Sequence, residues 1–113
     1  MANPTSKQPL HEVADAVLEI EQAMRSAQFW HDKVPAPAAM ASRTPFCADT
    51  LVFSEWLQFV FLPRMRVLIE NNQPLPSASA IAPLAEEALE IRPGRDLLLD
   101  RLRRFDQLIA DQH

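Results

Sequence analysis

The chain has 113 residues, the length of one ordinary domain with a real core, and 48% of them are hydrophobic, which excludes a disordered protein. One glycine and ten prolines argue against a hairpin-rich β structure, so helices are expected. The formal net charge of −4 disfavours non-specific binding to nucleic acid, because such binding relies on a basic surface.

Residues 1–9 are polar and interrupted by proline, which predicts a flexible N-terminal tail followed by a single domain over residues 10–113. A first helix is expected from Leu10 to about Phe29, because apolar residues alternate there at spacings of three and four. They share one helical face: Leu10, Val13, Val17, Ile20, Met24 and Ala27.

A long connection is expected over residues 31–48, where the helical periodicity ends. Prolines at positions 35, 37 and 45 impose extended or turn geometry on it. Its apolar residues Val34, Met40 and Phe46 indicate that it packs against the helices.

The second helix is expected to begin near Val52 or Phe53 and to run to about Asn71. Residues 56–62 include a single polar side chain, so this helix is predicted to be the central and most enclosed element. Pro63 lies in its middle and removes one backbone hydrogen bond, at a cost of roughly 3 kcal/mol, so the helix is expected to continue with a kink.

Two further helices are expected after a proline-rich connection over residues 73–80. The third is short and has Pro83 in its first turn. Its inward residues are expected to be Leu84, Ala88 and Ile91. A Pro-Gly break precedes the fourth helix, whose inward residues are expected to be Leu98, Leu102, Phe105 and Ile109. These elements predict an all-α fold, a four-helix bundle with a central, proline-kinked second helix.

No catalytic, metal or cofactor site is recognisable in these segments. Cys47 has no histidine nearby in sequence, although His31 could approach it in space, so a plain buried cysteine is expected. The three histidines are scattered, and no metal-ligand spacing occurs. A single glycine cannot build a phosphate-binding loop. The chain is therefore expected not to be an enzyme and to hold no cofactor or metal.

Six short strings form a distinctive set along the chain: Thr44-Pro45-Phe46, Glu55-Trp56-Leu57-Gln58, Pro63-Arg64-Met65, Pro74-Leu75-Pro76, Ile81-Ala82-Pro83 and Glu87-Ala88-Leu89. The set resembles the YqcC-like family of small bacterial proteins over nearly the whole chain. The resemblance implies an all-helical bundle, and some members carry the label tRNA pseudouridine synthase C by association with that enzyme. Pseudouridine synthases use an Arg-Leu-Asp signature with an aspartate nucleophile in a β-rich domain. The nearest strings here, Gly94-Arg95-Asp96 and Asp100-Arg101-Leu102, do not match it.

The candidate binding surface combines the exposed part of the second helix with the loop that follows: Trp56, Phe59, Arg64, Met65, Pro74, Leu75 and Pro76. Trp56 itself is expected to be mostly buried, with a ligand groove as the alternative. Arg64 lies on an otherwise apolar helical line, so it is expected to pair with Glu86 or Glu87 of the third helix. Binding of an anion or ligand by Arg64 is the alternative.

These patterns favour a protein-interaction or accessory module that binds an unidentified protein partner or itself. One alternative is a small-molecule-binding helical bundle, and another is an accessory factor to a tRNA-modifying pseudouridine synthase. Nucleic acid is expected to be contacted only indirectly. A cytoplasmic location without membrane contact is expected, because the apolar run that ends at Leu62 is too short to span a bilayer and no signal segment precedes it.

Overall fold

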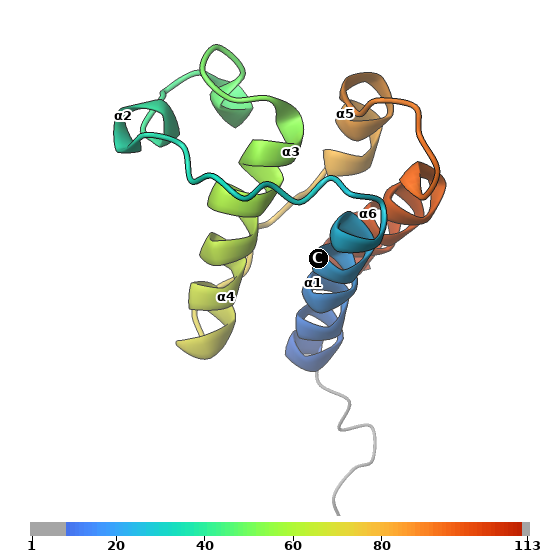
Figure 1. Cartoon of the computed structure of the whole chain (residues 1–113). Coiled ribbons are helices and arrows are strands. Elements are labelled where there is room, and N and C mark those ends of the chain that lie inside the picture. Colours follow the sequence, from blue (N-terminus) through green and yellow to red (C-terminus); the bar gives the residue numbers. More distant parts are fainter. Residues whose placement is uncertain (1–8, 112–113) are drawn as a thin grey trace, which may run out of the picture.

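The computed structural model describes residues 9–111, and this part of the chain is helical without strands, so the predicted all-α class is confirmed (Figure 1). The predicted tail falls almost wholly on residues 1–8, which lie outside the described residues. The elements are α1 (Pro9–Ser26), α2 (Pro37–Met40), η2 (Pro45–Cys47), α3 (Phe53–Trp56), η3 (Leu57–Phe61), α4 (Leu62–Glu70), α5 (Ile81–Ala88) and α6 (Arg95–Asp111).

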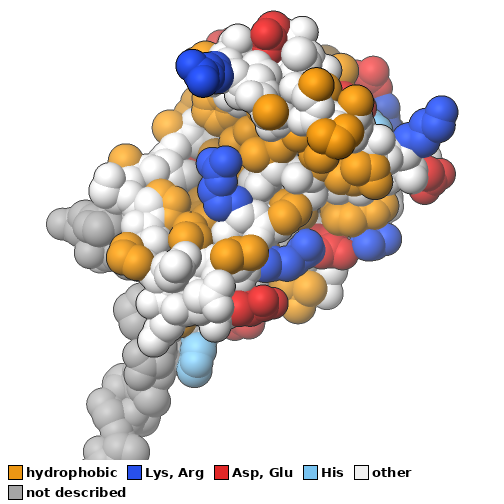
Figure 2. Space-filling model, turned by 90° about the vertical axis from the view of Figure 1, so that its left-hand side faces the viewer, with side chains coloured by type: hydrophobic (Ala, Val, Ile, Leu, Met, Phe, Trp, Pro, Cys, Tyr) orange, Lys and Arg blue, Asp and Glu red, His pale blue; other side chains and the backbone are white. Residues whose placement is uncertain are grey.

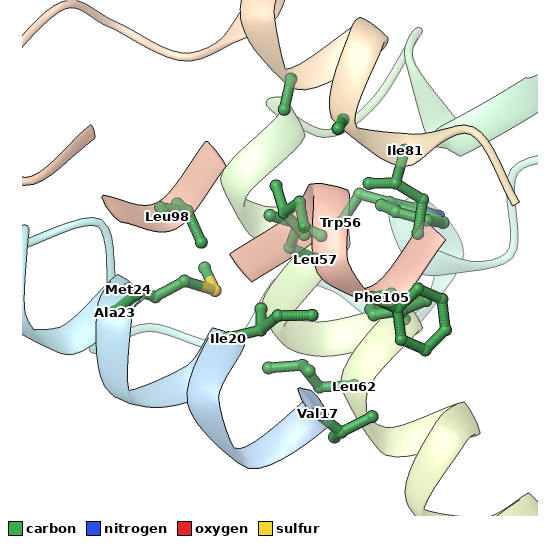
Figure 3. Packing of buried hydrophobic residues seen from close by; sticks show 14 of the residues in the cluster. Val17, Ile20, Ala23, Met24, Trp56, Leu57, Leu62, Ile81, Leu98 and Phe105 are labelled. Carbon is green, nitrogen blue, oxygen red and sulfur yellow. The ribbon is translucent and has the colours of Figure 1, made fainter. Parts of the chain in front are cut away.

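The core is built mainly between α1 and α6, which share the most extensive helix interface. The apolar spacing predicted both helices, and the four inward residues expected of α6 are all fully buried. Figure 3 shows side chains from α1, α6, α5 and the 53–70 segment pointing into one common core. No described helix is both long and apolar enough to cross a bilayer.

Helical structure runs without interruption from Phe53 to Glu70, through α3, η3 and α4 (Figure 1). The middle part, η3, is a π-helical turn in which the Leu62 amide donates to the Leu57 carbonyl. Proline cannot donate a hydrogen bond, and in a regular α-helix its ring would clash with the carbonyl four residues earlier. A wider turn directly before Pro63 moves that carbonyl and lets the helix continue. The bend expected at Pro63 stays a prediction.

This long helix is enclosed on one side and open on the other. Its α4 part packs on α1, and Leu57, Leu62 and Met65 are buried, whereas Phe59 and Val60 are only half-buried and Pro63 is exposed. The helix is therefore not covered on every side, although nearly all residues from 56 to 62 are apolar. The helix ends at Glu70, followed by Asn72 at φ 55°, in agreement with the predicted stop.

The inward face expected of α5 is also wrong. Ala88 is exposed and Ile91, with 91% of its surface accessible, lies beyond the end of the helix. The buried residues of this region are instead Ile81, Ala82, Ala85 and Leu89. The buried face is rotated because α5 packs on α6. The first turn of α6 is tied to the end of α5 by Arg95, whose guanidinium donates to the Glu86 and Leu89 carbonyls.

The 31–52 connection packs against the 53–70 helix, as predicted. It contains α2 and η2, both of which begin at a proline, and buries Cys47 and Leu51. Cys47 is buried, as predicted, and its thiol lies 3.7 Å from the Met40 carbonyl. Close by, a hydrogen bond from the Ser42 hydroxyl holds the pKa of exposed Asp49 below its ordinary value.

Gly94 lies directly before α6 and has little room for a side chain. Its φ is +91°, a conformation that L-residues rarely adopt, and a Cβ there would lie 2.8 Å from the Ala27 Cβ. We expect Gly94→Ala to lower the free energy of unfolding by about 1–2 kcal/mol, as measured by urea denaturation. Gly94→Asn distinguishes backbone strain from steric collision, because asparagine adopts positive φ more readily than alanine but places a Cβ equally close to Ala27. An unchanged free energy for Gly94→Ala would contradict this account.

Candidate functional site

One side of the 53–70 helix is not covered by the rest of the fold. Phe59 and Val60 are half-buried, whereas Pro63, Arg64 and Val67 are exposed, with 51% of Val67 accessible. These five residues, called the helix stripe below, recur at spacings of three and four and therefore lie along one side of the helix. A segment that is apolar on all sides but only partly covered leaves an apolar strip in contact with solvent.

Figure 2 shows the side of the molecule formed by α2, α3 and α4. Hydrophobic side chains are spread across it, Lys and Arg side chains lie among them, and acidic side chains lie mostly toward its edges. Protein interfaces are enriched in aromatic residues and arginine and poor in acidic residues at their centre. The composition of this face therefore resembles an interface more than an ordinary solvated surface.

Arg64 does not make the predicted ion pair with Glu86 or Glu87. Glu86 accepts a hydrogen bond at 2.6 Å from Arg103, and this bond raises the pKa of the Arg103 guanidinium. Arg64 is exposed and has no hydrogen-bond or ion-pair partner among residues 9–111. The prediction failed because α5 packs on α6, where Glu86 pairs with Arg103 instead of Arg64.

Two residues of the predicted binding surface belong to the core. Trp56 is 9% exposed and Met65 is 1% exposed, so the surface prediction is wrong for both, while the predicted burial of Trp56 is confirmed. Phe46 covers Trp56 edge-on, with ring centroids 4.8 Å apart, and Phe53 stacks on it at 5.8 Å. The covering ring of Phe46 comes from the preceding connection, which no helical pattern could reveal.

The loop part of the predicted surface is only partly available. Pro74 is exposed, whereas Leu75 and Pro76 are half-buried and Leu75 packs against the core. The predicted residues that are accessible on the helix itself are Phe59 and Arg64. Val60, Pro63 and Val67, which share their side of the helix, were not among the predicted surface residues.

A polar cluster that was not predicted from the sequence joins the first connection to the long helix. Gln58 accepts a hydrogen bond from the His31 amide at 2.7 Å and donates one to the His31 carbonyl at 3.0 Å. The hydroxyl of Ser54 lies 2.7 Å from the His31 ring Nε2. Ser54 and Gln58 are the buried polar side chains of the described core, and both contact this histidine. The signal in the sequence was the single glutamine within an apolar helical run.

A cleft of 210 Å³ opens beside this cluster, between the first connection and the end of α5. The charged groups of its wall already have protein partners: Arg92 pairs with Glu90, donates to the Gln28 carbonyl at 2.8 Å and stacks on the Phe29 ring. No described carboxylate contacts the His31 ring, so the Ser54–His31 contact lacks the third member of a nucleophilic triad. The cluster therefore acts as an anchor for the connection, and the cleft offers little to a polar ligand.

Comparison with known proteins identifies the family. Residues 12–108 match the family described as DUF446, tRNA pseudouridine synthase C. YqcC of Escherichia coli K12, described as an uncharacterized protein, is 44% identical over 93 residues, which cover 81% of this chain and 85% of YqcC. The solution NMR structure of E. coli YqcC superposes with a TM-score of 0.80 at 40% identity, covering 93% of this chain and 91% of that chain.

A second relative is a much longer protein than this chain. It is the protein named tRNA pseudouridine synthase C from Pectobacterium carotovorum, which is 41% identical over 66 residues. Those residues are 58% of this chain but only 18% of the Pectobacterium protein. The match over residues 12–108 and the identity with YqcC confirm the resemblance seen in the sequence: the chain belongs to the DUF446 family of YqcC-like proteins.

Proposed function

We propose that this protein is a binding module that acts as an accessory factor of a tRNA pseudouridine synthase in the cytoplasm. The observation that carries the proposal is the Pectobacterium relative, in which a segment similar to this chain makes up 18% of a longer protein named for that enzyme. In E. coli YqcC the similar region makes up 85% of the protein. The same type of domain thus occurs both as a short chain and as part of a longer protein.

This distribution has a simple physical interpretation. Joining two domains in one chain raises their effective concentration to the millimolar range, which favours the same contact that two separate chains make more weakly. A domain that is joined to an enzyme in one organism and separate in another is therefore a candidate to bind that enzyme.

The chain itself is a poor candidate for the catalyst. Pseudouridine synthases carry their aspartate nucleophile in a β-rich domain, whereas residues 9–111 of this chain are helical. Of the two nearest strings, Gly94-Arg95-Asp96 spans the start of α6, and Asp100-Arg101-Leu102 lies within the helix, where Asp100 pairs with Arg101. The net charge of −4 also disfavours direct binding of tRNA.

The test uses the tRNA pseudouridine synthase of the same organism, purified separately. Isothermal titration calorimetry is expected to show a complex with a Kd in the micromolar range or tighter. Pseudouridine formation in tRNA is expected with the synthase and not with this chain alone. A second pseudouridine synthase from the same organism serves as the control and is expected not to bind. Absence of a complex, or pseudouridine formation by this chain alone, would contradict the proposal.

A further inference from the structure

We infer that the helix stripe (Phe59, Val60, Pro63, Arg64 and Val67) is the docking site for an amphipathic helical segment of a partner protein, and that Arg64 binds a carboxylate of that segment. The identity of the partner as a pseudouridine synthase rests on the proposed function. The location of the site and the chemistry of its occupant rest on this chain alone.

The first observation concerns the ion-pair and hydrogen-bond partners of the arginines among residues 9–111. Six of them pair with carboxylates: Arg25, Arg66, Arg92, Arg101, Arg103 and Arg104. Arg95 donates to two backbone carbonyls. Within residues 9–111, Arg43 and Arg64 are left without a partner. Arg43 lies in the irregular part of the first connection, whereas Arg64 lies on a long helix among apolar side chains.

The long helix cannot supply a partner to Arg64. A carboxylate three or four residues away would be needed, and those positions hold Val60, Phe61, Val67 and Leu68. Arg66, two residues further along the helix, pairs with Glu21 of α1, which also accepts from Arg25, so that acid is already shared by two arginines. The guanidinium N–H donors of Arg64 therefore have no acceptor among residues 9–111, although they lie among apolar side chains.

The second observation is what surrounds Arg64 on the helix. Phe59, Val60, Pro63 and Val67 give an aromatic ring and aliphatic groups at helical spacing. An aromatic residue and an arginine at the centre of an apolar patch are the residues that most often dominate binding energy at protein interfaces. The π-helical turn at 57–61, a rare feature that is frequent at functional sites, includes Phe59 and Val60 of the stripe.

These surroundings determine the chemistry of the occupant. A nucleic-acid backbone requires several basic groups in a row, whereas the stripe offers one arginine among four apolar side chains. An apolar segment with one Asp or Glu complements it, because covering Arg64 with apolar groups excludes water and strengthens the ion pair. A helix with apolar residues at spacings of three and four is the form that best matches a helical stripe.

The first experiment measures binding of the separately purified synthase to variants of the stripe. Arg64→Glu and Phe59→Ala are each expected to weaken binding by about tenfold or more, because each removes a central contact. Arg43→Glu is the matched control and is expected to leave the Kd within about threefold of the wild-type value. Circular dichroism is expected to show that all three variants remain folded. If the wild type binds and Arg64→Glu binds equally well, the inference is wrong while the proposed function stands.

A second experiment does not depend on the synthase. A phage-displayed library of helical peptides of about four turns is selected on the wild-type chain, with Arg64→Glu used for counter-selection. We expect enriched peptides with apolar residues at helical spacing and one Asp or Glu. Replacing that acid by lysine is expected to abolish binding to the wild type and to restore it with Arg64→Glu.

Other outcomes would overturn the inference. These are failure to enrich any peptide that discriminates against Arg64→Glu, or a complex with tRNA that Arg64→Glu disrupts. A wild-type dimer in light scattering that Arg64→Glu converts to a monomer would also overturn it, in favour of self-association. If such peptides are enriched but no complex with the synthase forms, the stripe is supported as a docking site and the proposed function is refuted.

Discussion

Trp56→Ala is expected to lower the free energy of unfolding by about 3–5 kcal/mol, the largest effect of any substitution considered for this chain. Trp56 is 9% exposed and lies between Phe46, Phe53 and Phe61, with ring centroids at 4.8, 5.8 and 5.5 Å. Phe61 continues the series to Phe105 at 5.1 Å. Truncation removes these contacts and leaves a cavity that the surrounding rings cannot fill without rotating. Urea denaturation monitored by circular dichroism measures the loss.

Val67→Ala provides the matched control on the same helix. Val67 is 51% exposed, so its truncation is expected to change the free energy by less than about 0.5 kcal/mol. If Trp56→Ala left the melting temperature unchanged but abolished partner binding, Trp56 would line a binding groove and its assignment to the core would be wrong. The contrast thus compares a buried and an exposed residue of the same helix.

Asp106→Ala is expected to lower the free energy of unfolding by about 2–3 kcal/mol, because Asp106 of α6 caps the N-terminus of α5. The residue before α5 is Ala80, which has no side-chain oxygen to accept from the first amides of the helix. Asp106 accepts from the Ile81 amide at 3.1 Å and from the Ala82 amide at 2.9 Å. It also accepts from the Ser79 hydroxyl. Removing one carboxylate thus leaves three donors without their partner.

Asp100→Ala is the control for this second substitution. Asp100 is an exposed residue of the same helix that pairs with the adjacent Arg101, so its removal is expected to cost less than about 0.5 kcal/mol. Asp106→Asn is expected to fall between wild type and Asp106→Ala, because the amide keeps one acceptor oxygen without the negative charge. Equal stability of Asp106→Ala and Asp100→Ala would show that α5 does not depend on this cap.

The sequence alone determined where the four longer helical segments lie, but not the short α2 and η2. The alternating spacing of apolar residues predicted α1 and α6 and the buried positions of α6. The Asn-Asn-Gln-Pro and Pro-Gly strings predicted where α4 ends and where α6 begins. These features depend on residues within a few positions of one another, through helical periodicity, proline and the left-handed preference of glycine, so local physical chemistry was sufficient. Family membership also followed from the sequence, because short ordered strings carry it.

Only the tertiary structure decided which helix faces meet, because this depends on contacts between residues far apart in the chain. The prediction that Arg64 pairs with α5 assumed that consecutive helices are neighbours, but α5 packs on α6 and leaves Arg64 exposed. In the same way Phe46 buries Trp56, Gln58 holds His31, and Asp106 caps a helix to which it does not belong. Each is a contact between residues ten or more positions apart in the chain, and is fixed by how the helices and connections pack.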